Sequence, residues 1–256
     1  GSNVLSVLGP APGIPWGRAG GYPNVDLITP SGEQLAFVSN LVSLQYSDEQ
    51  DLTNPTMLQA ATDVLASWRS LFPDTLSFTN QNGAPWTDQQ FQQYMSAAQP
   101  DLLMFDYYAF NGMESFVHGG SPTQLYGHMA KERLRALRGN DGTGARPIPY
   151  GKYLQVWGGN QLIFNHTVSQ SELRLDVFSG LAFGYTYMTA FFYNSPNAPD
   201  LAPVLFSGPG DGSPTALFAA MAETNRQALN LGPALTRLVS TDVRFVLGQR
   251  PSGSKI

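Results

Sequence analysis

Three carboxylates, Asp48, Glu49 and Asp106, lie at or near the ends of two apolar stretches, where they can carry acid–base chemistry. The first two close "VSLQYSDE", and the third interrupts "DLLMFDYYAF". A carboxylic acid can donate a proton, while a second carboxylate accepts one or attacks as a nucleophile. Because a neighbouring negative charge and partial burial raise the pKa of a carboxyl group, one member of the Asp48–Glu49 pair is predicted to remain protonated. We interpret Glu49 as the candidate proton donor and Asp106 as its partner.

Two further readings of these acids stay open. Acidic residues also gather before helix starts, where the positive end of the helix dipole stabilises them, and Asp48 and Glu49 precede the helix start at Asn54 and Pro55. The second carboxylate is alternatively Glu114, in the segment after the Asp106 stretch. Asp48 itself is expected to make a hydrogen bond or to bind substrate.

Amide and aromatic residues gather at the same predicted strand ends. Such side chains bind sugars by hydrogen bonding and by stacking on the C–H faces, although core packing also uses aromatic residues. Tyr107 and Tyr108 are adjacent in sequence, so one of them must point towards a helix layer. Together with Asp48, the predicted substrate-binding residues are Asn80, Tyr108, Gln155, Trp157, Tyr193 and Asn194.

The elements that would position these residues alternate between strand and helix. Strands are predicted over 42–49, 76–80, 101–110, 150–158 and 185–193, and helices over 55–72, 87–99, 121–138 and 169–184, followed by a helix from 213 that breaks at Gly232–Pro233. Helix starts are marked by Asn54 before Pro55, by Thr87, and by a capping box of Ser169 with Glu172. A final extended piece is predicted over 242–248.

Strands separated by single helices are parallel and joined by right-handed crossovers, which leaves an open doubly wound sheet or a closed barrel. No glycine-rich nucleotide motif favours the former. We predict an α/β fold, a (β/α)8 TIM-type barrel that is either complete or shortened at its N-terminal side, as one domain over 1–256. Alternatively, residues 241–256 do not belong to this domain and are the start of a linker or of a truncated C-terminal module. The segment 3–9, "NVLSVLG", is a candidate sixth strand.

Four motifs together resemble TIM-barrel glycoside hydrolases of the clan that contains β-galactosidase-like and agarase-like enzymes. They are "YSDE", "PDLLMFDYYAF", "GLAFGYTYMTAFFY" and "ETNRQALNLGPALTRLVSTDV". The resemblance implies that 42–49 is the fourth barrel strand and 185–193 the eighth. It also implies a glutamate nucleophile at the end of the seventh strand, where this chain has Gln155, Val156 and Trp157 instead.

In this numbering of the barrel strands, Glu49 ends the fourth strand, and Asp106 lies on the sixth strand, over 101–110. Strands lie roughly 4.8 Å apart, so the two carboxyl groups should be separated by roughly 9 Å, which is typical of inverting glycosidases. We therefore predict inversion if both residues act.

Composition excludes several other functions. The net charge of -5 disfavours nucleic acid, the absence of cysteine excludes disulfides and thiolate metal sites, and three histidines show no ligand spacing. No apolar run reaches the length of a membrane span. We expect no metal, cofactor, nucleic acid or membrane partner. The compartment is not fixed, although an extracellular or periplasmic location is favoured.

The sequence thus predicts a glycoside hydrolase that cleaves a poly- or oligosaccharide with paired carboxylates. The alternatives are a non-catalytic carbohydrate-binding or degenerate barrel, and a fragment that needs a partner segment. Self-association or a partner domain is expected if the barrel is incomplete.

Overall fold

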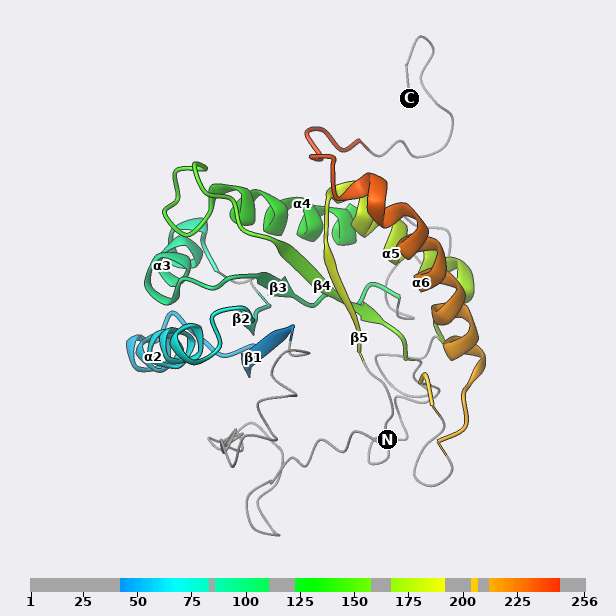
Figure 1. Ribbon diagram of the computed structural model, residues 1–256, viewed down its shortest axis with the longest axis horizontal. Helices are drawn as coiled ribbons and strands as arrows, with labels where there is room; N and C mark the ends of the chain where they lie inside the picture. The colour runs from blue at the N-terminus through cyan, green and yellow to red at the C-terminus, as the bar shows by residue number, and fades with distance from the viewer. Residues whose placement is uncertain are drawn as a thin grey trace.

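Five parallel strands in sequential order, β1-β2-β3-β4-β5, form one curled sheet (Figure 1). The computed structural model describes residues 42–82, 86–110, 123–157, 167–191, 204–206 and 212–244. Each neighbouring pair of strands is parallel, as the alternation of strands and helices requires. The fold is therefore α/β, and the sheet has the form of a half-barrel; a full (β/α)8 barrel is not seen within the described residues.

The strands lie where the sequence predicts them, with one clear difference in length. They are β1 (Ser43–Asp48), β2 (Leu76–Asn80), β3 (Leu103–Phe105), β4 (Tyr150–Gln155) and β5 (Tyr187–Phe191). The prediction for β3, over 101–110, was too long. Its pairing with β4 ends at Phe105, and the chain from Asp106 onward leaves the ladder while remaining largely buried.

The helices are α2 (Pro55–Leu71), α3 (Asp88–Ala98), α4 (Thr123–Arg138), α5 (Gln170–Phe183) and α6 (Ala216–Leu235). Three predicted starts are confirmed in detail. The Asn54 side chain accepts hydrogen bonds from the N–H groups of Thr56 and Met57. Thr87 and Ser169 each close a capping box with the residue three positions on. These local signals fix the starts of α2, α3 and α5 without help from the rest of the fold.

The predicted break in the last helix is wrong. Helix α6 runs without interruption through Pro233 to Leu235, and Thr215 stands at its N-cap. A proline inside a helix frees the carbonyl group four residues earlier, here that of Leu229. Leu229 is 76% exposed, so water can satisfy the freed carbonyl, and the helix continues for its last turn.

The two edge strands of the half-barrel are joined across its concave face by side chains. The hydroxyl groups of Ser43 on β1 and Tyr187 on β5 lie 3.0 Å apart, and Tyr153 of β4 donates a hydrogen bond to Gln45 of β1. Beneath these contacts the concave face holds a small apolar cluster of Phe78, Leu102 and Met104, against which Leu76, Tyr153 and Tyr187 pack. The concave face of the sheet therefore has an apolar core of its own.

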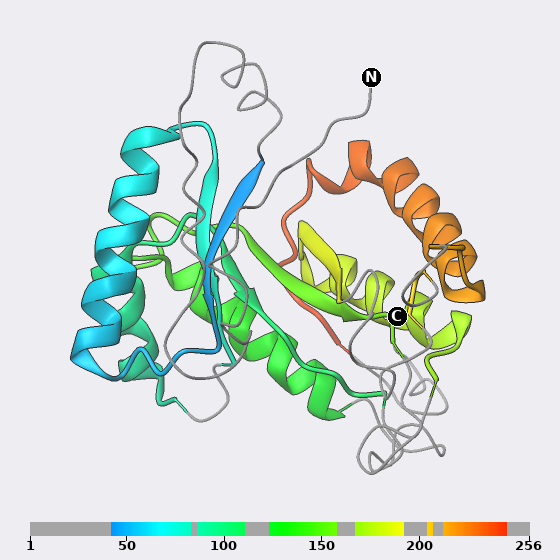
Figure 2. The same ribbon diagram turned by 90° about the horizontal axis from the view of Figure 1, so that it is seen from below.

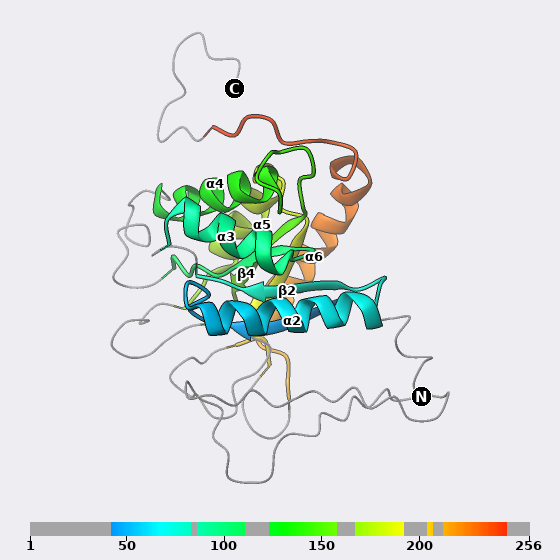
Figure 3. The same ribbon diagram turned by 90° about the vertical axis from the view of Figure 1, so that its left-hand side faces the viewer.

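The helices cover the outer face of the sheet in an arc from α2 to α6 (Figure 1), and α2 lies alongside β1 and β2 (Figure 3). Figure 2 shows α2 and α6 on opposite flanks, with the concave face between them. On the outer face, Lys152 of β4 is completely buried and forms an ion pair with Asp176 of α5, which is 2% exposed. Lys152 and Tyr153 thus point to opposite faces of the sheet.

Asn54→Ala is expected to lower the free energy of unfolding by about 1 kcal/mol, because the two N–H groups that Asn54 binds lose their partner. Urea unfolding followed by circular dichroism measures the difference. Asn54→Asp keeps the acceptor oxygen and should match the parent. An equal loss in both variants would show that the cap itself does not stabilise α2.

Some predicted segments lie outside the described residues. These are the candidate strand over 3–9 and the part of the final extended piece beyond 244; residues 242–244 are described and form no strand. Within the described part of the chain, the helices are too short or too polar to cross a lipid bilayer. The single-domain organisation and the linker or module over 241–256 stay predictions.

Candidate active site at the carboxyl ends of the strands

The end of β1 has an unusual backbone. The pairing of β1 with β2 shifts register between Gln45 and Asp48, which is the signature of a β-bulge. Ser47 and Glu49 on either side of Asp48 have φ angles of 59° and 49°, in the left-handed region that non-glycine residues seldom adopt. Two such residues cost on the order of 1–3 kcal/mol each, and strain of this kind gathers at functional sites.

The strand then leads into α2 through a short turn that does not depend on Glu49. Leu52 is buried to 2% exposure and anchors the turn, while Asp51 accepts hydrogen bonds from Thr53. Because Asn54 caps α2 by itself, the side chain of Glu49 is not needed as a helix cap. Glu49 is exposed and remains available for other contacts.

Asn80, the last residue of β2, connects all three candidate carboxylates. Its side-chain Nδ2 donates a hydrogen bond of 2.8 Å to Asp48 Oδ1. Its side chain also lies close enough to Asp106 to lower the pKa of that carboxyl group. Its backbone carbonyl accepts a hydrogen bond of 3.0 Å from the N–H of Glu49. Asn80 itself is 3% exposed, whereas Asp48 and Glu49 are exposed, so these contacts lie at the boundary between the core and solvent.

The carboxyl groups of Glu49 and Asp106 lie close enough together for Glu49 to raise the pKa of Asp106. The two residues therefore face the same side of the sheet. The two carboxyl groups therefore lie closer together than the predicted separation of about 9 Å. The prediction of inversion loses this geometric support and stays a prediction. The estimate assumed regular strands, whereas the bulge and the left-handed residues at the end of β1 redirect the chain towards β3.

The pKa of Asp106 is raised from 3.8 to about 7. Burial is the largest cause, followed by the negative charge of Glu49, the hydrogen bond with Glu49 and the charge of Asp48; the hydrogen bond from Asn80 acts in the opposite direction. Asp106 Oδ1 is buried without a hydrogen-bond partner among the described residues. At neutral pH the Asp106 carboxyl group is therefore partly protonated and can donate a proton.

The two adjacent tyrosines after Asp106 point in opposite directions, as their alternation predicts. Tyr107 faces the helix layer, where its ring stacks on His128 at 4.1 Å between centroids and its hydroxyl donates to Gln124. Tyr108 faces the carboxylates and hydrogen bonds with Asp106. Burial, the nearby Asp106 and Asp48 charges and Tyr153 raise the pKa of Tyr108, which therefore stays protonated and acts as a hydrogen-bond donor.

Gln155 ends β4 at the position where the resemblance implies a glutamate. Its amide makes two hydrogen bonds with the backbone of Phe110: it accepts from the N–H at 3.0 Å and donates to the carbonyl at 2.7 Å. Gln155 is 1% exposed. It thus fixes the segment that carries Asp106, and this contact explains why the chain beyond β3 stays ordered without pairing in the sheet.

Three aromatic side chains pack together beside Asp106. Tyr108 stacks on Phe191 at 5.6 Å between ring centroids and meets Trp157 edge-on at 5.4 Å. Trp157 is 2% exposed, whereas Phe191 is 38% exposed. Phe191 is therefore the member of this group that a ligand can reach.

Sequence reasoning missed Phe191, Tyr153 and Gln45. Tyr153 lies two residues before Gln155 and Phe191 four residues after Tyr187, so the period of two along a strand was an available signal for both. Burial, the charges of Asp48 and Asp106 and the neighbouring Tyr187 raise the pKa of Tyr153, although its hydrogen bond with Gln45 acts in the opposite direction. No sequence signal indicated Gln45, because its place in the site depends on the register shift that follows it in β1.

Three predicted site residues, Glu114, Tyr193 and Asn194, lie outside the described residues. Over the described ranges, no group of three or more histidine, aspartate and glutamate side chains is arranged to hold a metal ion. The structure thus brings together Asp48, Glu49, Asn80, Asp106 and Tyr108, with Gln155 and Trp157 next to them.

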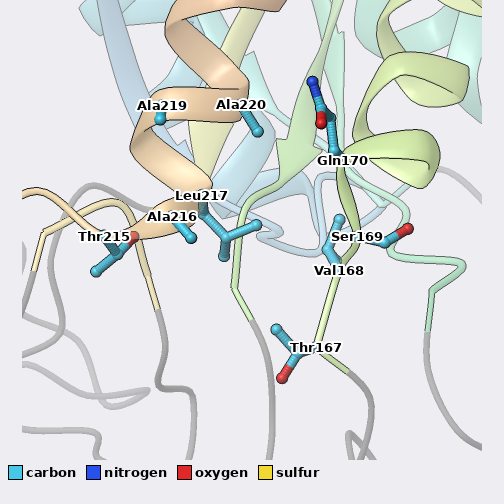
Figure 4. A pocket seen from close by; sticks show the side chains of 9 residues that line it. All are labelled: Thr167, Val168, Ser169, Gln170, Thr215, Ala216, Leu217, Ala219 and Ala220. Carbon is cyan, nitrogen blue, oxygen red and sulfur yellow. The ribbon is translucent and has the colours of Figure 1, made fainter.

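A separate cavity of about 450 Å³ lies between the N-terminal ends of α5 and α6 (Figure 4). Its wall is mainly apolar and includes Val168, Leu217 and Ala220, with Ser169 and Thr215 at the helix starts. Ser169 is already used in the capping box of α5. The cavity shares no residue with the carboxylate group and supplies no acid or base.

Asp106→Asn is expected to gain stability relative to the parent as the pH rises. Because the folded-state pKa of Asp106 is raised to about 7, the folded state holds its proton more tightly than the unfolded chain does. The parent therefore loses stability between about pH 4 and pH 7, and the asparagine variant lacks this loss. Since partial exposure and sharing with Glu49 weaken the effect, the relative gain at pH 8 over pH 4 should be about 2 kcal/mol.

Urea unfolding of both proteins at the two pH values measures this difference. Asp51→Asn is the matched control, because Asp51 is exposed. A difference between parent and Asp106→Asn that does not change with pH would contradict the shifted titration.

Comparison with known proteins finds a distant structural likeness to a β-galactosidase. No protein-family model matches the sequence, and no curated protein matches it. The chain is similar to the crystal structure of β-galactosidase from the psychrophilic Marinomonas ef1, with a TM-score of 0.50 and 12% identity over 70% of this chain and 27% of that one. The chain thus spans about a quarter of that enzyme's length.

A second similar structure is a protein from Bacteroides thetaiotaomicron VPI-5482 assigned as an α-L-fucosidase. Its TM-score is 0.39 at 9% identity, over 66% of this chain and 50% of that one, and at this level the likeness carries no argument. The fold thus resembles, at a distance, part of the β-galactosidase structure.

Proposed function

We propose that this protein is a glycoside hydrolase in which Glu49 and Asp106 form the acid–base pair. The observation that carries the proposal is that Glu49 and Asp106 follow the carboxyl ends of β1 and β3 and lie close enough for Glu49 to raise the pKa of Asp106. Barrel enzymes take their catalytic residues from this end of different strands. The distant likeness to a β-galactosidase agrees with the proposal at the level of fold.

Within this proposal the roles of the two acids are exchanged relative to the sequence hypothesis. Asp106, with a pKa of about 7, is the group that holds a proton at neutral pH, and it becomes the general acid. Glu49, exposed at the strained turn, becomes the base that activates water or the nucleophile that attacks the sugar. The proton of Asp106 would pass to the glycosidic oxygen as the sugar–oxygen bond breaks.

Substrate binding must set the distance between the two carboxyl groups. Retaining glycosidases hold theirs about 5–5.5 Å apart and inverting ones about 6.5–9.5 Å. Glu49 is the residue able to move, because its side chain is exposed, whereas Asp106 is held by Asn80 and Tyr108. The stereochemical outcome then follows from how far Glu49 moves.

The aromatic group supplies a platform for a sugar ring. Phe191 is partly exposed and is backed by Tyr108, which stands beside Asp106. Sugars stack their C–H faces on such rings. A sugar on Phe191 would place its glycosidic bond within reach of the carboxyl pair.

A panel of polysaccharides and aryl glycosides, with proton NMR of the first products, tests the proposal. Activity is expected on a subset of the panel, with a falling alkaline limb in kcat/KM near pH 7 that reflects loss of the Asp106 proton. The anomeric form of the first product reports inversion or retention. An absence of hydrolysis across the panel, with oligosaccharide binding intact, would reject the enzymatic function.

The second candidate function is non-catalytic carbohydrate binding. The observation that favours it is Gln155, an amide already bonded to Phe110 at the position where the resemblance implies a nucleophile. Calorimetric binding of an oligosaccharide that is recovered intact would favour this candidate. Loss of that binding in Phe191→Ala would assign the binding to the same concave face.

A further inference from the structure

The register of three strands brings the acids of the site together. Asp48 is the register partner of Asn80 and accepts a hydrogen bond of 2.8 Å from its side-chain nitrogen. On the other side of β2, Asn80 is the register partner of Met104, which belongs to the apolar cluster of the concave face. Asp106 lies two residues after Met104, and Tyr107 after it faces the helix layer, so Asp106 faces the concave side. The acids of β1 and of the segment after β3 therefore lie on the same face, with Asn80 between them.

Asn80 provides an observation that does not depend on these charges. The residue is 3% exposed, and its Nδ2 is used by Asp48. Its Oδ1 has no hydrogen-bond partner among the described residues. An exchange of oxygen and nitrogen would place an acceptor against the Asp48 carboxylate, so this orientation of the amide is the favourable one. Because a buried oxygen without a donor is energetically costly, a ligand that brings an N–H donor past the exposed Asp48 and Glu49 side chains would satisfy it.

Lysine and arginine lie elsewhere in the described part of the chain. Lys152 is the one member of either type on the described strands, and it is buried on the outer face with Asp176. The others that the structure describes lie on helices, between α4 and β4, or after α6. The residues that can gain a positive charge in the sequence segments that follow the strands are His118 and His166. None of the 14 lysine and arginine residues occurs in these segments, which are 49–54, 81–87, 106–122, 156–169 and 192–215.

The site therefore concentrates negative charge without a lysine or arginine among the described residues. Asp48 and Glu49 are exposed, so their charges face an incoming ligand. Carboxylate or sulfate groups on a sugar are repelled there, whereas a positive group is attracted. Phe191, which is 38% exposed and stacks on Tyr108, adds an aromatic ring whose face also attracts cations. A sugar with a protonated amino group fits both features.

We propose that the site selects glycans that contain amino sugars with a free, protonated amino group, of the glucosamine or galactosamine type. The ammonium group lies among Asp48, Glu49 and Asn80, where its three N–H donors bind the two exposed carboxylates and the unused Oδ1 of Asn80. An N-acetyl group has a single donor and no charge, so it binds less tightly. The inference rests on the proposed function for its hydrolytic meaning and deepens it by naming the substrate class. Binding itself requires no cleavage.

Isothermal titration calorimetry at about pH 6 and low salt tests the selectivity. The probes are glucosamine and galactosamine oligosaccharides, their fully N-acetylated counterparts of the same length, and an oligogalacturonate. At least one amino oligosaccharide should bind on the order of 10-fold more tightly than its N-acetylated counterpart, and the oligogalacturonate should not bind. The preference should fall steeply when salt is raised to about 0.5 M. Equal or weaker binding of the amino form in both series would overturn the inference.

Asp48→Asn separates a specific site from general attraction to an acidic protein. The asparagine keeps an oxygen that can accept the hydrogen bond from Asn80, while the charge is lost. The amino oligosaccharide should bind about 5-fold less tightly, and binding of the N-acetylated one should be unchanged. Asp63→Asn is the matched control, because Asp63 is an exposed acid on α2 that bonds with Gln59. An equal loss in both variants would assign the binding to net charge and overturn the inference.

The outcomes for the inference and for the proposed function are distinct. If the protein hydrolyses neutral glycans and amino groups do not improve binding, the inference fails and the proposed function stands. If it binds amino oligosaccharides selectively and cleaves nothing, the inference stands as a binding specificity and the enzymatic function fails. If it neither binds nor cleaves any of these glycans, both fail.

Discussion

Glu49→Gln and Asp106→Asn are each expected to lower kcat on the order of 10³-fold on any glycoside that the parent cleaves. Both changes keep the shape of the side chain and remove its ability to exchange a proton, which contributes a factor of about 10² to 10⁴ in acid–base catalysis. Because Glu49 raises the pKa of Asp106, the two carboxyl groups are expected to act as one unit. The double variant should therefore lose little more than either single variant.

The matched control is Asp51→Asn, since Asp51 is an exposed acid on the same turn that bonds with Thr53. It should keep full activity. External azide or formate is expected to rescue part of the activity of Glu49→Gln if Glu49 is the base or nucleophile, and of Asp106→Asn if the roles are the reverse. Full activity in both single variants would remove the carboxyl pair from the mechanism.

Lys152→Met is expected to lower the free energy of unfolding by about 3–5 kcal/mol. Lys152 is completely buried and pairs with Asp176, which is 2% exposed, so removing the lysine leaves a buried charge without a partner. Urea unfolding at pH 7 measures the loss. The pair lies on the outer face of the sheet, away from the carboxylate site, so the change tests stability and not catalysis.

The double variant Lys152→Met with Asp176→Leu should recover most of the loss, because two apolar side chains of similar volume replace both charges. Arg226→Met serves as the surface comparison, since Arg226 pairs with Glu223 on the exposed side of α6 and its loss should leave the unfolding midpoint unchanged. A double variant as unstable as Lys152→Met would show that the ion pair itself stabilises the joint between β4 and α5.

The elements were predictable because their signals are local. Asn54, Thr87 and Ser169 cap their helices through hydrogen bonds to residues two or three positions on, and these bonds need nothing else in the fold. The position of Glu49 at a strand end followed from the same reasoning. The distant glycoside-hydrolase-like fold is likewise consistent with the resemblance carried by four motifs.

The geometry within the site was not predictable, because it depends on non-local contacts. The bulge before Asp48 redirects Glu49 towards Asp106, and nothing in "LQYSDE" distinguishes it from a regular strand. The two hydrogen bonds between Gln155 and Phe110 join positions 45 residues apart. Pro233 shows the opposite error. Its local signal predicts a break in the helix, whereas α6 continues through it to Leu235, near the exposed end of the helix.

The strand order β1-β2-β3-β4-β5 has a consequence for how the chain folds. Every pairing joins consecutive strands, so the sheet can grow one strand and one helix at a time with short loop closures. The contact between Ser43 and Tyr187 spans 144 residues and needs both edges in place. This contact is therefore expected to form last, after both edge strands have joined the sheet.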